Sequence, residues 1–378
     1  MKVLIVKTSS LGDVIHTLPA VTDAASKLPV RFDWVVEEAF SDVPIWHPAV
    51  DRVIPIGLRR WRRSLFKAWR SGEVGQFIQS LRQEKYDLVI DAQGLLLKSG
   101  IVGLMAKGQR VGYDRQSVRE PLSSLTYQKQ YSVSRELNAV ERIRRLFSQA
   151  LQYDFSNDTV DYGIASSFSR DDKEANARYL LFLHSTTWLT KHWPEQYWSE
   201  LALLATNAGY EVLWAWYTPE ERLRAERLMR VGGGKLAPRC KLNEMAQLIS
   251  GATGVVGVDS GLAHMAAALN RPAVTLYGPT SIDLTGAIGC MQRNLSSNYH
   301  CSPCLSRQCK EAEHVKKKSG PSFGSDFQQI DCDATAQNRV GDSMQRLIQI
   351  FPPCFMELYP ALVWEVMQKK IEKRRGNA

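Results

Sequence analysis

A short polar turn interrupts an apolar stretch in the second half of the chain. Gly254 to Val258 has the length and composition of a buried strand, and Asp259, Ser260 and Gly261 separate it from Leu262 to Leu269, a run of strong helix formers. The free N–H groups and the dipole of a helix N-terminus favour an anion such as a diphosphate. The pattern predicts an anion site, although Asp259 or Ser260 would serve equally well as a helix N-cap. Ser260 stands one position too late for a G-x-S-x-G nucleophile.

A second group of polar residues follows the first apolar run. Lys2 to Lys7 has the composition of a strand, and the loop after it holds Ser10, Gly12 and Asp13. Gln93 follows a later strand and would lie at the same edge, where open α/β sheets bind ligands. Asp13 is therefore either a helix cap or a carboxylate base that faces a ligand. The loop lacks the G-x-G-x-x-G pattern, which argues against a dinucleotide-dependent oxidoreductase.

Hydroxyl and charged groups also follow two strands of the second half. Thr186, Thr187 and Lys191 come after the strand predicted at Tyr179 to His184, and such groups suit contact with phosphate or ribose. Glu221 begins a later helix after another strand. An acid in the first turn of a helix also complements the helix dipole, so a ligand-binding role for Glu221 is one of two interpretations.

The segment Leu58 to Arg70 is strongly basic. It carries five arginines, one lysine and two tryptophans but no acid, and the whole chain has a formal net charge of +9. Most charge runs are solvated faces, but this one favours contact with phosphate groups or anionic lipid because no acid within it offsets the charge. A nucleic-acid partner is not expected, since no recognised nucleic-acid motif accompanies the segment.

The cysteines raise the question of a metal site. Cys301, Cys304 and Cys309 follow the spacing C-x2-C-x4-C, and Cys354 is a candidate fourth ligand for zinc or an iron–sulfur cluster. A second C-x2-C pair is missing, so free thiols are the favoured interpretation and no metal is predicted. Seven cysteines without an export signal indicate a reducing compartment.

The order of the predicted elements indicates the fold class. Strands alternate with helices through most of the 378 residues, which predicts an α/β protein with doubly wound parallel sheets. We expect a first domain over 1–155, a second over 173–310, a flexible insertion over 311–350 and a C-terminal helix within 351–378. The sequence has no run of about 18 apolar residues, so we expect no transmembrane helix. The N-terminal apolar run is too short for a signal peptide.

Five segments agree in order and spacing with one known family. They are Lys7 to Asp13, Trp34 to Glu38, Asp91 to Gly94, Lys191 to Pro194 and Val258 to His264. Through them the chain resembles the lipopolysaccharide heptosyltransferases of glycosyltransferase family 9, over roughly the first 310 residues and again near Pro352. Arg59 to Arg63 and Arg119 to Leu122 are most similar to the enzymes that add the first heptose.

The resemblance implies a GT-B fold, in which two Rossmann-like domains face each other across a cleft. The first domain would bind the acceptor, the second would bind ADP-heptose, and the last helix would pack back on the first domain. The implied reaction is an inverting, metal-independent transfer of L-glycero-D-manno-heptose from ADP-heptose to Kdo of Kdo2-lipid A, without a cofactor. The enzyme would work in the cytoplasm, in peripheral contact with the anionic inner membrane.

The resemblance also implies roles for single residues. Asp13 would be the general base, and Lys191 would offset the charge on the departing diphosphate. The implied donor-binding residues are Thr186, Thr187, Glu221, Cys240, Asp259, Ser260, Gly261 and His264. The implied acceptor-binding residues are Ser10, Gly12, Arg59, Arg60, Arg62, Arg63, Gln93 and Arg119. Cys240 stands where the family pattern has a methionine beside the adenine.

Two alternatives remain at this point. One is the related enzyme that adds the second heptose, with the same donor and another acceptor. The other is a non-catalytic protein that docks on anionic membrane through Leu58 to Arg70. The second alternative does not account for Asp13, Lys191 and Asp259 all standing at strand ends.

Overall fold

The computed structural model describes residues 1–157, 159–168, 178–311 and 352–376. Its first part contains β1 (Lys2–Val6), α1 (Leu11–Ile15), α2 (Leu18–Lys27), β2 (Arg31–Glu37), η1 (Glu38–Phe40), α3 (Asp42–Ile45), β3 (Val50–Ile56), α4 (Leu58–Trp61), α5 (Leu65–Arg70), α6 (Glu73–Arg82), β4 (Leu88–Asp91), η2 (Leu96–Gly100), α7 (Ile101–Met105), β5 (Gln109–Tyr113), η3 (Pro121–Thr126), β6 (Lys129–Tyr131), α8 (Ala139–Leu151) and η4 (Ala165–Phe168).

The second part contains β7 (Tyr179–Leu183), η6 (Leu189–Lys191), α9 (Glu195–Asn207), β8 (Glu211–Trp214), α10 (Pro219–Gly232), β9 (Lys235–Leu236), α11 (Leu242–Gly251), β10 (Gly254–Val258), α12 (Gly261–Ala268), β11 (Ala273–Tyr277), α13 (Ile282–Thr285), β12 (Gln292–Ser296), η9 (Pro353–Phe355) and α15 (Pro360–Gly376). The predicted insertion at 311–350 lies outside the described residues except for its first one.

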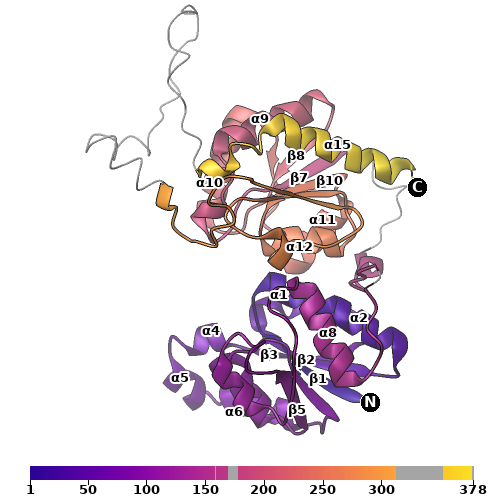
Figure 1. Ribbon diagram of the computed structural model, residues 1–378. Coiled ribbons are helices and arrows are strands. Elements are labelled where there is room, and N and C mark those ends of the chain that lie inside the picture. Colours follow the sequence, from indigo (N-terminus) through magenta and orange to yellow (C-terminus); the bar gives the residue numbers. More distant parts are fainter. Residues whose placement is uncertain (158, 169–177, 312–351, 377–378) are drawn as a thin grey trace, which may run out of the picture.

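The strands form two six-stranded sheets, one in each domain. The first has the order β3-β2-β1-β4-β5-β6 and the second the order β12-β11-β10-β7-β8-β9. Neighbouring strands run parallel in both sheets. In each sheet the chain starts near the middle, builds one half, and then crosses to build the other half. The predicted pair of doubly wound parallel sheets is confirmed, and Figure 1 shows one domain above the other.

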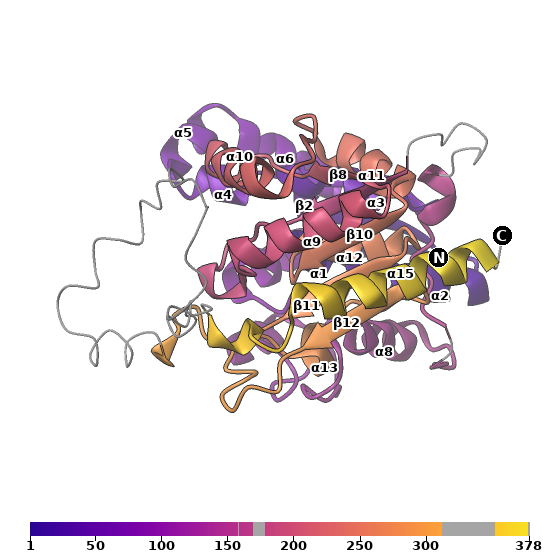
Figure 2. The same cartoon turned by 90° about the horizontal axis from the view of Figure 1, so that it is seen from above.

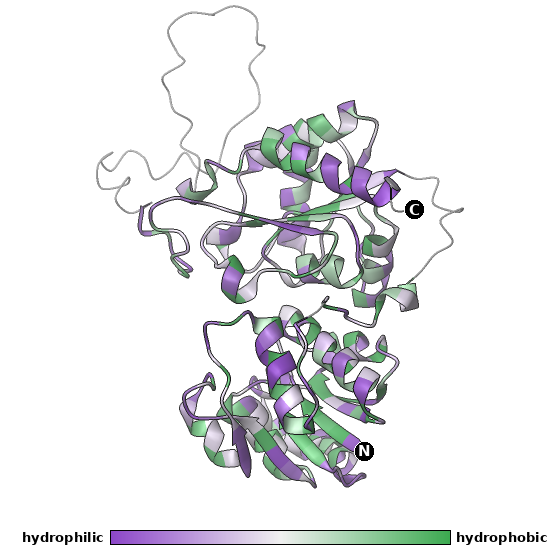
Figure 3. Cartoon of the chain, turned by 45° about the vertical axis from the view of Figure 1, so that its right-hand side comes forward, coloured by the Kyte–Doolittle hydropathy of each residue, from purple (hydrophilic) through white to green (hydrophobic). Residues whose placement is uncertain are grey.

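The central strands are apolar because helices cover both faces of each sheet. All five residues of β10 are buried, as are all five of β11. Strands buried on both faces lack the alternation of a half-exposed strand, which explains their continuous apolar sequence. Figure 3 shows hydrophobic residues gathered along the strands of both sheets. Among the described residues, no helix has the length and apolar composition needed to cross a bilayer.

The last helix lies on the second domain, so the prediction that it packs back on the first domain was wrong. The apolar side chains Val363, Met367 and Ile371 of α15 belong to the core that also contains Leu180 of β7. Gly254 of β10 makes room for this helix, because a Cβ atom there would lie 2.6 Å from the sulfur of Met367. Figure 2 shows α15 running beside α9 across the second sheet.

This packing predicts a large effect of shortening Met367, which is fully buried. We expect Met367→Ala to lower the free energy of unfolding by about 2 to 5 kcal/mol, because apolar burial is lost and a cavity remains between α15 and the sheet. Urea unfolding followed by tryptophan fluorescence measures the change. Met356→Ala is the matched control, since Met356 is 48% exposed and its loss should change stability by less than about 0.5 kcal/mol. Equal stability of the two variants would contradict the packing of α15 described above.

Candidate active site

The predicted site residues gather at the switch points of the two sheets. The order in which the chain adds strands reverses between β1 and β4 in the first sheet, and between β10 and β7 in the second. The segments that hold Asp13 and Gln93 follow the carboxyl ends of β1 and β4, and those that hold Lys191 and Asp259 follow β7 and β10. Crevices outside the carboxyl ends of parallel strands at such points are the usual ligand sites of open α/β sheets.

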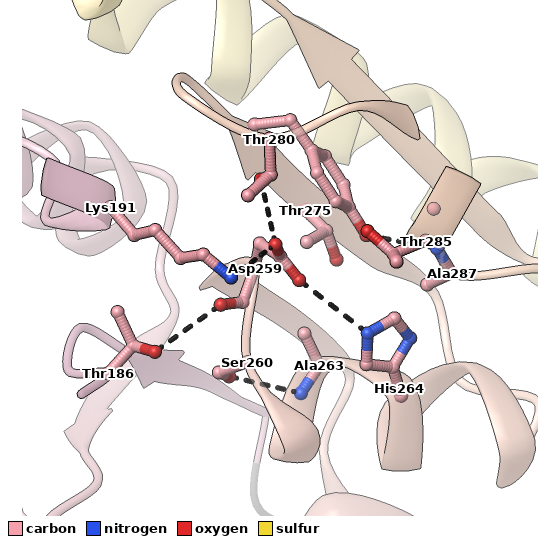
Figure 4. Close-up of polar contacts among 12 residues, drawn as sticks. Thr186, Lys191, Asp259, Ser260, Ala263, His264, Thr275, Thr280, Thr285 and Ala287 are labelled. Carbon is pink, nitrogen blue, oxygen red and sulfur yellow. Dashed lines mark hydrogen bonds and ion pairs between the residues drawn. The ribbon is translucent and has the colours of Figure 1, made fainter. Parts of the chain in front are cut away.

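The carboxylate of Asp259 is the centre of the second domain's half of the site. Its Oδ2 accepts hydrogen bonds from Lys191 Nζ and Thr280 Oγ1, both at 2.7 Å, and its Oδ1 lies 3.6 Å from His264 Nε2. Figure 4 shows these three side chains converging on Asp259 from separate elements. Burial raises the pKa of Asp259, but the contact with His264 and the charge of Lys191 outweigh it and bring this pKa below its usual range. Asp259 is therefore an ionised, buried carboxylate.

Ser260 and Thr186 lie beside this carboxylate. Ser260 is the N-cap of α12, and its hydroxyl accepts a hydrogen bond from the backbone N–H of Ala263 at 3.4 Å. The capping role considered for Ser260 is thus confirmed. Thr186 Oγ1 donates to the backbone carbonyl of Asp259 at 3.4 Å (Figure 4), and Thr187 is exposed. The N-terminus of α12 and the loop after β7 therefore lie against each other.

Two predicted donor residues have clear local roles. Glu221 closes a capping box with Thr218 at the start of α10, where its Oε2 accepts from the backbone N–H groups of Tyr217 and Thr218 at 2.8 and 3.2 Å. Glu221 thus lies in the first turn of α10, as the helix-dipole interpretation expected, and it also caps this helix with one carboxylate oxygen. Cys240 is buried, and its thiol donates to the carbonyl of Pro238 at 3.2 Å.

Asp13 carries the first domain's half of the site. Its Oδ2 accepts hydrogen bonds from the backbone N–H and the hydroxyl of Ser10, at 2.7 and 2.9 Å. Lys7 Nζ lies 3.7 Å from Asp13 Oδ1. Burial raises the pKa of Asp13, but the charge of Lys7 and the bonds from Ser10 contribute to a net lowering. Asp13 is thus both a cap of α1 and an ionised carboxylate with 36% of its side chain exposed.

The two halves of the site meet where α1 packs against α12. His16 Nε2 and His264 Nδ1 lie 3.1 Å apart, and their rings meet edge to face. Two glycines permit this approach. A Cβ atom at Gly261 would lie 2.9 Å from the side chain of Leu11, and one at Gly12 would lie 3.1 Å from His264. Gly12 and Gly261, predicted to contact opposite substrates, both stand at the domain contact.

The remaining acceptor candidates border the loop after β1. Gln93 Oε1 accepts hydrogen bonds from the backbone N–H groups of Thr8 and Ser9, each at 3.1 Å. Arg119 is exposed. The next residue, Glu120, donates a backbone hydrogen bond to Gly94 O at 3.1 Å, which links this segment to the loop that holds Gln93. These contacts fix the shape of the first domain's side of the site.

Comparison with known proteins identifies the family. Residues 74–315 match the family model described as glycosyltransferase family 9 (heptosyltransferase). Lipopolysaccharide heptosyltransferase 1 of Pseudomonas aeruginosa is 50% identical over 311 residues, which cover 82% of this chain and 87% of that protein. The chain belongs to glycosyltransferase family 9. It is therefore an enzyme, a heptosyltransferase, and the resemblance found in the sequence motifs is confirmed.

Solved structures agree with this assignment. The structure of E. coli heptosyltransferase WaaC with ADP-2-deoxy-2-fluoro heptose superimposes with a TM-score of 0.73 at 40% identity, and covers 84% of this chain and 100% of that chain. The GT-B fold expected from the resemblance is confirmed. By contrast, lipopolysaccharide heptosyltransferase 2 of Salmonella typhimurium is 35% identical over only 29% of this chain and 34% of that protein.

The basic segment of this heptosyltransferase is less uniform than its sequence indicates. Arg60 forms ion pairs with Glu38 and Glu73, so acids from neighbouring elements offset part of the charge. The expectation of wholly unbalanced charge was wrong, because residues outside the segment supply the acids. Arg62 and Arg63 are exposed. The segment begins close to the site, because Glu37 links the two. The carboxylate of Glu37 accepts a hydrogen bond from the backbone N–H of Arg59, and the backbone N–H of Glu37 donates to Thr8 O, both at 3.0 Å.

Sequence reasoning missed three residues of this family 9 site. Lys7 is buried and donates to Ala92 O at 2.9 Å, Thr280 donates to Asp259, and His16 meets His264. Lys7 directly follows β1, so its position was a detectable signal. Thr280 comes shortly after the end of β11, so its position was a detectable signal for the same reason. His16 had no such signal, since only the packing of α1 on α12 makes it part of the site.

The buried His16 predicts a dependence of stability on pH. Burial and the neighbouring His264 lower the pKa of His16 well below its ordinary value of about 6.5. Below about pH 6.5 the unfolded chain therefore binds a proton that the folded chain does not, so stability falls as the pH falls. We expect His16→Gln to reduce this slope by up to about 1.4 kcal/mol per pH unit between pH 6 and 5.

Urea unfolding at several pH values from 7.5 to 5 would measure the slope. His300→Gln is the control, because the His300 side chain is 65% exposed and its replacement should leave the slope unchanged. An unchanged slope in His16→Gln would show that His16 titrates alike in the folded and unfolded chains.

Proposed function

We propose that this family 9 enzyme transfers the first heptose of the lipopolysaccharide inner core from ADP-heptose to Kdo of Kdo2-lipid A. The observation that carries the proposal is the 50% identity over most of the chain to a lipopolysaccharide heptosyltransferase 1. The arrangement of Asp13 opposite Asp259 and Lys191 across the domain contact supports it, because a transferase needs a base and a leaving-group site on facing surfaces.

The donor would bind to the second domain. WaaC has been solved with ADP-2-deoxy-2-fluoro heptose, which supports ADP-heptose as the donor here. The N-terminus of α12 at Ser260 and Gly261 offers N–H groups to the diphosphate. Lys191 supplies a positive charge next to it. Its ammonium group has three donors, so it can keep one hydrogen bond to Asp259 and still contact a phosphate oxygen.

The chemical step we propose is a single inverting displacement. The Kdo hydroxyl oxygen attacks the anomeric carbon of the heptose, its proton passes to Asp13, and the bond from that carbon to the diphosphate breaks to release ADP. Asp13 suits the role of base because its pKa is lowered, so the carboxylate is ionised at neutral pH. Charge that develops on the leaving diphosphate would be offset by Lys191 and the helix N-terminus, so the transfer step itself needs no metal.

The remaining donor roles follow the family pattern. Asp259 would accept hydrogen bonds from the heptose hydroxyls, Glu221 would reach the ribose through its second carboxylate oxygen, and Cys240 would lie near the adenine. Thr186, Thr187 and His264 would complete the diphosphate site. The capping bonds of Glu221 support a fixed orientation of that carboxylate.

The acceptor would bind along the basic face of the first domain. Its phosphates and Kdo carboxylates suit the exposed Arg62 and Arg63, with Arg59 and Arg119 nearer the site. Phe66 and Trp69 of α5 are 68% and 70% exposed beside these charges. Exposed aromatic groups among arginines suit the surface of an anionic bilayer, so we propose peripheral contact with the cytoplasmic face of the inner membrane through α5.

The experiment that tests the reaction measures ADP release from ADP-heptose and Kdo2-lipid A without added metal. We expect the wild type to turn over and Asp13→Asn to lose about 100- to 10,000-fold in kcat, because the attacking hydroxyl lacks its base. Asp87→Asn is the matched control, since Asp87 is an exposed acid before the amino end of β4, at the edge of the sheet opposite the site, and it should keep full activity.

Two other outcomes would change the proposal. If the wild type releases no ADP with Kdo2-lipid A but extends an acceptor that already bears one heptose, the second-heptose function replaces it. Equal activity of Asp13→Asn and wild type would remove Asp13 from the mechanism and leave the family assignment intact.

The basic face gives a separate prediction about the acceptor. We expect the double exchange Arg62→Gln and Arg63→Gln to raise the KM for Kdo2-lipid A by about 10- to 100-fold, because charged hydrogen bonds contribute about 1.5 to 3 kcal/mol each and part of this is screened at the surface. The affinity for ADP-heptose should not change. The exposed Arg82 and Arg230, exchanged in the same way, serve as the control. An unchanged acceptor KM would exclude Arg62 and Arg63 from the acceptor site.

A further inference from the structure

Four cysteines from two separate parts of the chain line one cavity. Cys301, Cys304 and Cys309 come from the loop after β12, and Cys354 comes from η9, more than forty residues later in the sequence. All four are free thiols. The loop alone holds three of these thiols, and the fold brings Cys354, the candidate fourth ligand of the sequence analysis, to the same cavity.

This set of side chains has the chemistry of a metal site. Four thiolates are the ligands of structural zinc and of mononuclear iron, whereas hard cations prefer oxygen. Thr190, Ser302 and three prolines complete the lining, so the four cysteines are its only metal-binding groups among the described residues. We propose that Cys301, Cys304, Cys309 and Cys354 together bind one transition-metal ion, zinc or iron, in the second domain.

The thiols would have to move closer to hold an ion. Within the described residues, no three cysteine, histidine or acidic side chains are already arranged as a metal centre. The three loop cysteines lie outside regular helices and strands, and Cys304 is exposed, so bringing their thiols closer to Cys354 would not disturb a sheet or a long helix. Cys354 itself is buried.

The ion would have a structural role next to the donor site. The cysteine loop is tied to the loop after β11, since Ser302 Oγ donates to Gly278 O at 2.5 Å and Leu305 N donates to Pro279 O at 2.7 Å. Thr190 Oγ1 donates to Ser306 O at 2.9 Å. Thr190 precedes Lys191, and Pro279 precedes Thr280, which donates a hydrogen bond to Asp259. A metal at the cluster would therefore hold in place the two loops that carry the partners of Asp259.

The test measures metal in the full-length enzyme, purified with a thiol reductant and without chelators. We expect inductively coupled plasma mass spectrometry to find about one zinc or iron per chain, and Cys304→Ser and Cys354→Ser to lower this ratio several-fold. Cys290→Ser is the matched control, because Cys290 is exposed and lies outside the cavity, and it should keep the metal. A visible thiolate-to-iron absorption band distinguishes iron from colourless zinc.

The result does not depend on the transferase reaction. Wild type that holds no zinc or iron as purified, and takes up neither after anaerobic reconstitution, would overturn the proposal. Retention of the metal by both Cys304→Ser and Cys354→Ser would also overturn it. Cys304 is exposed, so its serine variant reports on metal binding even if replacing the buried Cys354 disturbs folding. The positioning role further predicts that metal loss raises the KM for ADP-heptose while the KM for the acceptor stays unchanged.

Discussion

The close approach of α1 to α12 is the constraint on which the rest of the site depends. Glycine at positions 12 and 261 leaves room for the two helices to come this near, and the His16–His264 contact then joins the domains. His16 is buried and its pKa is lowered, so the contact is made between rings of which at least one is neutral. Asp13 and Asp259 owe their facing positions to this contact. A side chain at either glycine would press on this contact, against His264 at position 12 and against Leu11 at position 261.

Each domain supplies its own positive partner for its buried carboxylate. Asp13 is offset by Lys7 in the first domain, and Asp259 by Lys191 in the second. Each carboxylate stays ionised despite burial, because the nearby ammonium and the hydrogen-bond partners, His264 for Asp259 and Ser10 for Asp13, together outweigh the cost of desolvation. The same arrangement suits the proposed reaction, in which one carboxylate accepts a proton while positive charge remains available for the diphosphate. Both pairs stand at the switch point of a parallel sheet, where loops diverge and leave room for ligands.

The elements missed from the sequence share a physical cause. Gln109–Tyr113 forms β5 although its polar start and its glycine resemble a loop, because pairing with β4 and β6 outweighs weak local propensity. The last helix was predicted as an element but assigned to the wrong domain. The glycine at 254 that admits Met367 carries no signal of its partner in the sequence.

The sequence by itself determined the local units of this protein. Buried strands are recognisable as continuous apolar runs. The polar residues that follow these runs, including Asp13, Lys191 and Asp259, could therefore be placed after strand ends from the sequence alone. Only the tertiary structure decided which of these ends meet. The pairing of His16 with His264, the acids opposite the basic segment and the gathering of four cysteines join residues far apart in the chain. Such contacts depend on packing between elements, which local pattern and propensity do not encode.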